Sequence, residues 1–292
     1  MTQQRPRTTP FPHWSLPAAL LRISITIGLL TALIVAFFAS LERRDVGQLA
    51  AGSVAVLTAP VGAAQRLNLT VAPNTSHTLQ LRAAPDFTAR LTASRRGDLR
   101  LTPRPSPAGE RRWTLSRAVQ GLPVLIQLDA QSGLPGALSL DVPGRVPLTL
   151  SLSRSADDTD LDLREVQLER LNVAASGGQL RATLPLRGQA RLSLSGSGSR
   201  AALRLPPGTA RLTLDARLSG GSLSLTLPPG AQVQLDVRSS GAPIPAPPGF
   251  EVSTLPDRRT RRYVQVGRAG GPRLSATLNL TDTTLILQGD LP

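Results

Sequence analysis

The hydrophobic pattern of the chain changes near residue 46. Before it, residues 23–41 form the apolar run ISITIGLLTALIVAFFASL, which contains no charged side chain. A helix rises about 1.5 Å per residue, so this run covers most of the ~30 Å hydrocarbon core of a bilayer. A buried helix of a soluble protein would carry a polar stripe, which the run lacks. The pattern therefore predicts one transmembrane helix over residues 23–41.

The flanking charges predict the orientation of this helix. Residues 1–22 carry three arginines and no acid, whereas residues 42–45 read Glu-Arg-Arg-Asp. Because orientation follows the number of basic residues, three against two favours a short basic cytoplasmic tail at 1–22 and export of the chain after residue 46. A cleaved signal peptide is the alternative, but Phe38 stands where a cleavage site needs a small residue. We expect an uncleaved, single-pass signal anchor in the cell membrane.

After residue 46 the apolar residues alternate with polar ones. Residues 67–71 (LNLTV) and 148–152 (LTLSL) are clear cases, and glycine or proline interrupts most such runs within ten residues. Alternation with period two is typical of strands with one buried face, and helices nucleate poorly in segments this short. The exported part is therefore predicted to be all-β.

The second half of the exported part contains a repeat. Prolines precede Gly188, Gly208, Gly230 and Gly249, at glycine spacings of 20, 22 and 19 residues. Each interval reads as a strand, a Ser/Gly corner, a second strand and a proline turn, with glycine accepting the positive φ of a type II turn. Such a repeat predicts a stacked-strand, β-solenoid-like domain, and a β-sandwich with regular hairpins is the alternative.

We expect the exported part to consist of two β regions that meet near residue 155, without a sharp boundary. Residues 156–292 carry the repeat and form the predicted β-solenoid-like domain. Residues 46–155 are less regular, with proline-rich interruptions at 103–107 and 133–136. We expect this half to be a small N-terminal β-subdomain or to supply strands to the same sheet system.

One stretch resembles a known group of bacterial envelope proteins. Residues 161–173 read LDLREVQLERLNV and are followed by the corner Ser176-Gly177-Gly178 and by Leu184-Pro185. This run is similar to the "LDL…VERLxL…G…G…L.LP.G" pattern of toast-rack, adhesin-like and LiaF-type proteins. Further segments that resemble the group are 112–115, 227–237 and 249–251. The resemblance implies a toast-rack type fold at a bacterial envelope and, in some relatives, a part in sensing envelope stress; it supplies no catalytic residue.

The composition excludes several kinds of chemistry. All 33 basic residues are arginine, cysteine is absent, and there are only two histidines. The chain therefore has no thiol nucleophile, no thiolate metal site and no lysine for a Schiff base. We expect no cofactor and no enzymatic activity. A β-solenoid hydrolase or lyase acting on envelope polysaccharide, with a pair of carboxylates, is the alternative.

An acidic cluster is the one candidate metal site. Alternate aspartates could offer oxygen ligands to Ca²⁺, but the glycine and the later glutamate of a calcium loop are missing. On a strand the same residues would share the solvent face, and this interpretation is favoured. The candidate ligands are Asp158, Asp160 and Asp162.

Paired arginines are the candidate binding residues. After residue 45 the chain carries 28 arginines and 17 acidic residues. Guanidinium groups bind phosphate and carboxylate, so anionic lipid headgroups, an envelope glycopolymer or a partner envelope protein are the expected partners. Codon usage rich in GC would also raise the arginine content.

Nucleic acid is not expected as a partner, because the anchor places these arginines outside the cytoplasm. A nucleic-acid binder facing inward is the remaining alternative. The candidate anion-binding residues are Arg111, Arg112, Arg258, Arg259, Arg261 and Arg262.

Overall fold

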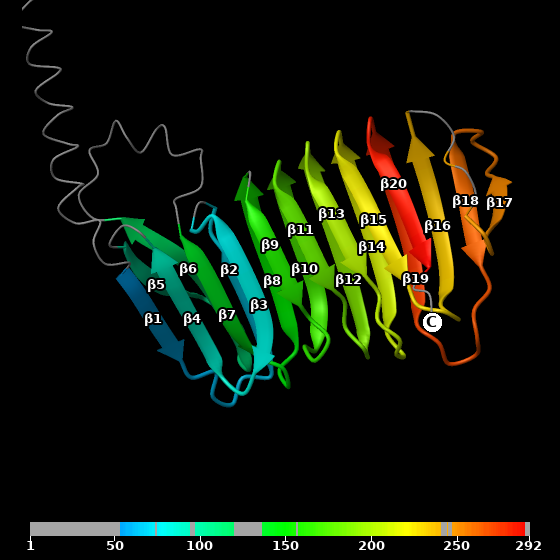
Figure 1. Ribbon diagram of the computed structural model, residues 1–292. Coiled ribbons are helices and arrows are strands. Elements are labelled where there is room, and N and C mark those ends of the chain that lie inside the picture. The colour runs from blue at the N-terminus through cyan, green and yellow to red at the C-terminus, as the bar shows by residue number, and fades with distance from the viewer. Residues whose placement is uncertain are drawn as a thin grey trace, which may run out of the picture. The chain divides into compact units, whose positions relative to one another are not determined.

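Alternating apolar residues place the described part of the chain in two large β-sheets (Figure 1). The structure is a computed structural model that describes residues 53–73, 75–93, 97–119, 136–155, 157–240, 244 and 247–289. All of them belong to one compact unit, Gly52–Pro292. The predicted tail at 1–22 and helix at 23–41 lie outside the described residues. Within the described ranges, no helix has the length and hydrophobicity needed to cross a membrane.

The nine-stranded sheet has the order β1 (Ser53–Ala59), β4 (Phe87–Ala93), β7 (Ala137–Pro143), β3 (Thr78–Ala84), β9 (Asp158–Asp162), β11 (Gln179–Thr183), β13 (Arg200–Arg204), β15 (Ser222–Leu227) and β20 (Thr284–Gly289). The eleven-stranded sheet has the order β17 (Glu251–Thr254), β18 (Thr260–Gln265), β16 (Gln232–Ser239), β19 (Arg273–Thr281), β14 (Arg211–Ser219), β12 (Gln189–Ser197), β10 (Leu168–Ser176), β8 (Leu148–Ser155), β2 (Arg66–Val71), β6 (Glu110–Val119) and β5 (Gly97–Arg104). The prediction that the chain after residue 46 is all-β is confirmed for these residues.

Leucine fills the space between the sheets. Strand β14 shows strict alternation of exposed and buried residues, with Leu212, Leu214 and Leu218 on its inner face. A buried leucine contributes about 1.5–3 kcal/mol relative to an exposed one, so the alternation fixes which face of each strand points inward. On β14 the polar side chains are left on the outer face.

The chain passes repeatedly from one sheet to the other. Each of the strands β8, β10, β12 and β14 is followed by a strand of the nine-stranded sheet, and neighbouring strands pair in parallel. The register advances by one repeat: Leu171 lies opposite Leu192, and Leu192 lies opposite Leu214. Both sheets continue across residue 155, since β8 pairs with β10 and β3 pairs with β9.

The order of the strands departs from the order of the sequence at both ends. Strand β19 pairs with β14 on one side and β16 on the other, so the C-terminal pair β19–β20 inserts before β16. At the opposite end β6 lies outside β2. Three of the four sheet ends carry antiparallel strands, with β18 on β16 and β17, β5 on β6, and β1 on β4. At the fourth end β20 pairs in parallel with β15.

The proline turns follow the expected geometry at three of four glycines. Gly188, Gly230 and Gly249 have φ values of 87°, 80° and 84°. Gly208 is not in the positive-φ region; a Cβ atom there would lie 2.2 Å from the carbonyl oxygen of Leu186. Glycine is required at 208 because two turns approach each other closely, not because of its backbone angle.

The repeat also ends earlier than the sequence pattern indicates. Among the described residues that follow β16, the next strands are those of the β17–β18 hairpin, which belongs to the eleven-stranded sheet. The described part of the fourth interval therefore does not repeat the strand pair of the preceding intervals.

Candidate anion-binding site

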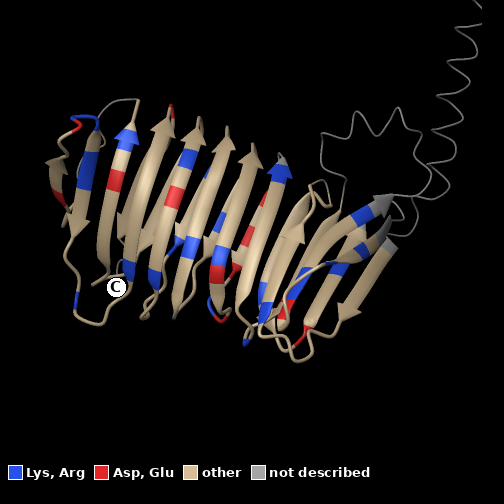
Figure 2. Ribbon diagram, turned by 180° about the vertical axis from the view of Figure 1, so that it is seen from behind, with Lys and Arg blue, Asp and Glu red and all other residues tan. Residues whose placement is uncertain are grey.

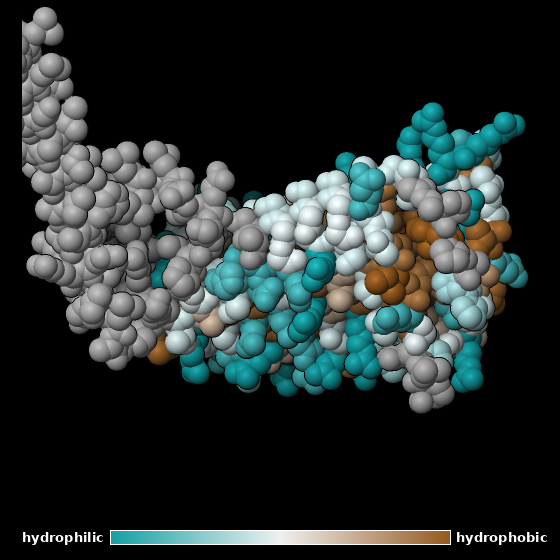
Figure 3. All heavy atoms as spheres, turned by 45° about the horizontal axis from the view of Figure 1, so that its top comes forward, coloured by the Kyte–Doolittle hydropathy of each residue, from teal (hydrophilic) through white to brown (hydrophobic). Residues whose placement is uncertain are grey.

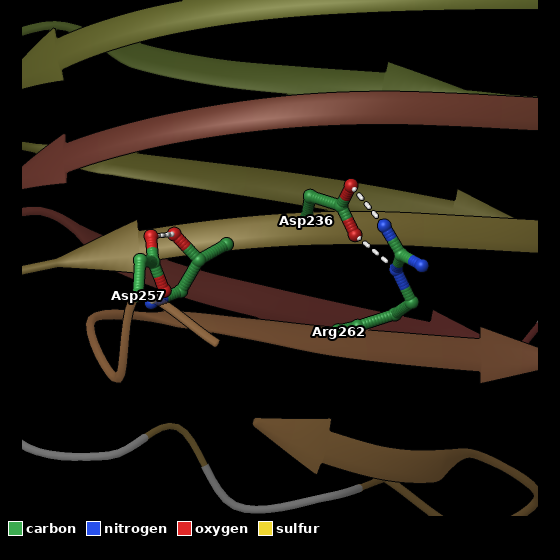
Figure 4. A network of polar contacts seen from close by, with 4 residues as sticks. Asp236, Asp257 and Arg262 are labelled. Carbon is green, nitrogen blue, oxygen red and sulfur yellow. Dashed lines mark hydrogen bonds and ion pairs between the residues drawn. The ribbon is translucent and has the colours of Figure 1, made fainter. Parts of the chain in front are cut away.

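A carboxylate organises the turn that presents the C-terminal arginines. Asp257 Oδ1 accepts hydrogen bonds from the backbone N–H groups of Arg259 (3.1 Å) and Thr260 (2.9 Å), and Oδ2 accepts one from Thr260 Oγ1 at 2.6 Å (Figure 4). These bonds, chiefly the one from the Thr260 hydroxyl, lower the pKa of Asp257. Arg258, in the middle of the turn, has a φ of 55°. The turn thus holds successive arginines in a defined conformation at the start of β18.

Three of the predicted arginines line one pocket. Arg258, Arg259 and Arg261 border a cavity of about 590 Å³ at the ends of β16, β18 and β19. Arg238 of β16, which lies opposite Thr260 in the sheet, completes the lining as a fourth arginine. None of the described lining residues is acidic. We call these four residues the arginine pocket.

A buried tyrosine forms part of the pocket wall. Tyr263 is fully buried, and its hydroxyl donates a hydrogen bond of 2.8 Å to the carbonyl oxygen of Ile244. A buried phenol that is satisfied in this way fixes the position of the strand carrying it. Arg261 lies two residues before Tyr263 on β18, so the tyrosine holds the backbone that presents this arginine.

Arg262 points away from the pocket. Its guanidinium donates hydrogen bonds to both oxygens of Asp236 on β16, at 2.7 and 2.9 Å (Figure 4). These bonds raise the pKa of Arg262. Arg262 is therefore held by Asp236 and is not among the residues that line the pocket. The structure therefore separates the fourth predicted arginine of the hairpin from the other three.

The remaining predicted pair lies at the other end of the molecule. Arg111 and Arg112 belong to β6, and seven strands separate β6 from β18 in the sheet order, a distance on the order of 40 Å. Arg112 Nε lies 2.5 Å from Glu110 Oε1, and Asn68 donates to the same oxygen. Arg112 is therefore paired with an acid of its own strand, and neither arginine contributes to the arginine pocket.

The three candidate calcium ligands lie along β9. Asp158 and Asp160 are exposed, and Asp162 accepts hydrogen bonds from the guanidinium and the backbone N–H of Arg164, which lower its pKa. Alternate residues of a strand are about 7 Å apart, whereas Ca²⁺ needs several oxygens at about 2.3–2.6 Å. Among the described residues no three His, Cys, Asp or Glu side chains are arranged to hold a metal ion.

Arg238 is the pocket residue that sequence reasoning missed. It stands alone in Val237-Arg238-Ser239, without the paired arginine used to select candidates. Its position follows from the antiparallel pairing of β16 with β18, which places it opposite Thr260. The alternation of β16 would have placed Arg238 on the outer face, but only the pairing shows which turn it meets.

The comparisons with known proteins bear on the fold. No protein-family model and no curated protein matches the sequence. The crystal structure of a candidate cell adhesion protein from Clostridium sporogenes is similar to the structure of this chain, with a TM-score of 0.52 and 10% sequence identity. The similarity covers 82% of this chain and all of that one. At this identity the match shows a shared all-β fold and nothing about the activity.

Proposed function

We propose that this chain is a non-enzymatic, membrane-anchored protein of the cell envelope whose exported β-domain binds anionic envelope components. In this proposal the fold is a toast-rack type β-solenoid, and binding serves scaffolding or the sensing of envelope stress. The observation that carries the proposal is the arginine pocket. The fold shared with a candidate cell adhesion protein and the predicted anchor at 23–41 support it.

The chemistry of the arginine pocket fits an oxyanion. Each guanidinium offers several N–H donors in a planar fork that matches two oxygens of a phosphate or carboxylate. Four such groups surround one cavity, from Arg238, Arg258, Arg259 and Arg261. None of the described lining residues is an acid that could neutralise them. The nearby carboxylate of Asp257 accepts hydrogen bonds from Thr260 and from the backbone of the turn, and it also interacts electrostatically with Arg238. A phosphate or carboxylate carried by an envelope component would offset this charge.

The test is a thermal-shift titration of the full chain with inorganic phosphate, at constant ionic strength with chloride as the replacement ion. A ligand that binds the folded state raises Tm by mass action. We expect phosphate to raise the Tm of the wild-type chain and to have little effect on the triple variant Arg258→Gln, Arg259→Gln, Arg261→Gln.

The matched control removes the same number of arginines elsewhere. The variant Arg90→Gln, Arg187→Gln, Arg200→Gln changes exposed residues outside the pocket. It is expected to respond to phosphate as the wild type does. Equal responses of the two triple variants would contradict binding in the arginine pocket, as would a response that persists unchanged at high salt.

A further inference from the structure

A second set of arginines crosses the outer face of the eleven-stranded sheet. Four consecutive strands, β10, β12, β14 and β19, each contribute one exposed arginine near the strand start (Figure 2). Arg170 and Arg191 are register partners, and Arg211 and Arg273 are register partners. We call these four residues the arginine track; they line one groove of about 890 Å³. The residues of the track are separate from those of the arginine pocket.

The line of arginines in the track is displaced once along the strand direction. Register partners on neighbouring strands are about 4.8 Å apart. Between β12 and β14 the track shifts by two residues, because Arg211 lies opposite Gln189 and not opposite Arg191. This diagonal step is about 8 Å from strand spacing and rise. The guanidinium-bearing residues therefore follow a line with intervals of about 5 to 8 Å.

The charges of the track are not neutralised within the described residues. No side-chain hydrogen bond or ion pair joins the guanidinium groups of these four arginines to any described residue. The one acid in the groove lining, Glu169, lies 3.3 Å from Arg66. Like charges on directly opposite residues of neighbouring strands destabilise a sheet. The two arginine pairs therefore cost stability that a bound anion would offset.

Several exposed arginines outside the track lie beside an acid. On the outer face of the nine-stranded sheet, Arg82 hydrogen-bonds Asp141, and Arg181 lies in register with Asp160. A general excess of arginine would distribute charge over both faces without regard to acids. The concentration of unpaired arginines in one groove distinguishes the track from that background.

The groove lacks the groups that bind bases or sugar rings by stacking. Its described lining contains no Phe, Trp, Tyr or His. Single-stranded nucleic acids are held by a combination of basic grooves and aromatic platforms. The groove supplies charge without stacking, which favours a polymer with a flexible backbone and a charge on each repeat.

We infer that the arginine track binds a linear phosphodiester polymer of the envelope, of the poly(glycerol phosphate) type. Each repeat of such a polymer has six backbone bonds, twice the three of a peptide residue, and so spans at most about 7 Å. This spacing lies within the intervals of the track, so successive phosphates meet successive arginines. The inference rests on the proposed function, because it requires an exported domain, but it uses a site that the arginine pocket does not share.

The experiment measures binding of fluorescent poly(glycerol phosphate) of about twenty repeats to the purified full chain by fluorescence anisotropy. The track variant is Arg191→Gln, Arg211→Gln, and the control is Arg90→Gln, Arg200→Gln on the other sheet. We expect the track variant to lose about tenfold in affinity and the control to lose little, with a weaker salt dependence for the track variant. Equal losses in both variants would overturn the inference, since net charge alone would then explain binding.

Two further binding measurements distinguish a failure of this inference from a failure of the proposed function. Loss of polymer binding in the pocket variant alone would overturn the track while leaving the proposed function in place. Equal or tighter binding of alginate, a carboxylate polymer, or of oligo(dT) would overturn the assignment to an envelope phosphodiester polymer. Without ligand, the track variant is expected to keep or raise its Tm because it removes like-charge pairs, so weaker binding cannot be attributed to unfolding. A lower Tm would contradict the claimed repulsion.

Discussion

Arg154 and Asp157 form an ion pair inside the corner between β8 and β9. Arg154 Nε lies 3.6 Å from Asp157 Oδ2, and the two side chains are 2% and 0% exposed. Burial lowers the pKa of Arg154, and the charge of Asp157 partly opposes this effect. Arg154 Nη1 also donates to Ser76 Oγ, at 3.4 Å, so the pair joins two adjacent corners of the stack.

Removal of one partner of this pair should destabilise the domain strongly. Arg154→Met removes the arginine beside the buried carboxylate of Asp157, which keeps His77 Nδ1 at 3.4 Å from its Oδ1. Removal of one partner of a buried ion pair costs about 3–5 kcal/mol. The free energy of unfolding, measured with urea on the full chain, checks this. The double variant Arg154→Met, Asp157→Leu should recover much of the loss. A single variant as stable as Arg187→Met, which changes an exposed turn residue, would contradict a structural role for the pair.

Gly178 should tolerate no side chain. Its φ is 72°, and a Cβ atom would lie 2.2 Å from the carbonyl oxygen of Asp157 in the adjacent corner. Gly178→Ala should therefore lower Tm by more than Gly188→Ala, where φ is 87° but the space is open. The difference between the two variants isolates the close approach from the backbone angle, which costs about 1–2 kcal/mol for alanine. Equal Tm values would show that the corners can separate without cost.

The turn at Asp257 should lose stability in acid. Its pKa is lowered from an ordinary value of 3.8, chiefly by the hydroxyl of Thr260. Because the folded-state pKa is depressed, the stabilisation is fully present above the unfolded-state value and is lost as pH falls through the folded-state value. Carboxyl NMR titration should show the pKa of Asp257 below 3.8 in the wild type and higher in Thr260→Ala. An unchanged pKa in this variant would contradict the hydrogen bond.

An exchange of the charges of Asp236 and Arg262 should preserve most of the stability of the domain. Arg262→Asp places two acids opposite each other on β16 and β18 and should lower Tm. The double variant Asp236→Arg, Arg262→Asp restores opposite charges and should recover most of the loss. A double variant no more stable than the single one would show that packing, and not charge, holds this position.

The pattern of the sequence was enough to predict the strands but not their neighbours. Period two placed Leu67, Leu148 and Leu212 inside strands, because burial of one face dictates alternation. The insertion of β19 between β14 and β16 could not be predicted, since pairing of distant strands leaves no local signal. The hairpin β17–β18 was likewise missed, because Gly249 continues the glycine spacing of the repeat although the strands no longer do.

The candidate sites were predictable to a different extent. Adjacent arginines identified Arg258, Arg259 and Arg261, but Arg262 pairs with Asp236 and does not line their pocket. The arginine track was overlooked because its members are isolated in the sequence. Arg170, Arg191 and Arg211 nevertheless recur 21 and 20 residues apart, the spacing of the repeat itself. A search for charges that recur at the repeat spacing would have found them.

The surface offers a position for testing the topology. Most of the described surface in Figure 3 is polar, and hydrophobic colour gathers toward the C-terminal end. Three large hydrophobic residues of the C-terminal part of the chain are exposed: Val252, Val266 and Ile286. Ser197, at the end of β12, is exposed and lies away from this patch, from the pocket and from the track. The chain has no cysteine, so a single introduced thiol reports one position.

The central claim is that the β-domain lies outside the cytoplasm, and labelling of Ser197→Cys in intact cells with a membrane-impermeant maleimide tests it most directly. Ser15→Cys, on the other side of the predicted anchor, is the matched control. We predict that Ser197→Cys is labelled before permeabilisation and that Ser15→Cys is labelled only after it. Labelling of position 15 alone in intact cells, or of position 197 only after permeabilisation while a known surface thiol reacts, would contradict the account.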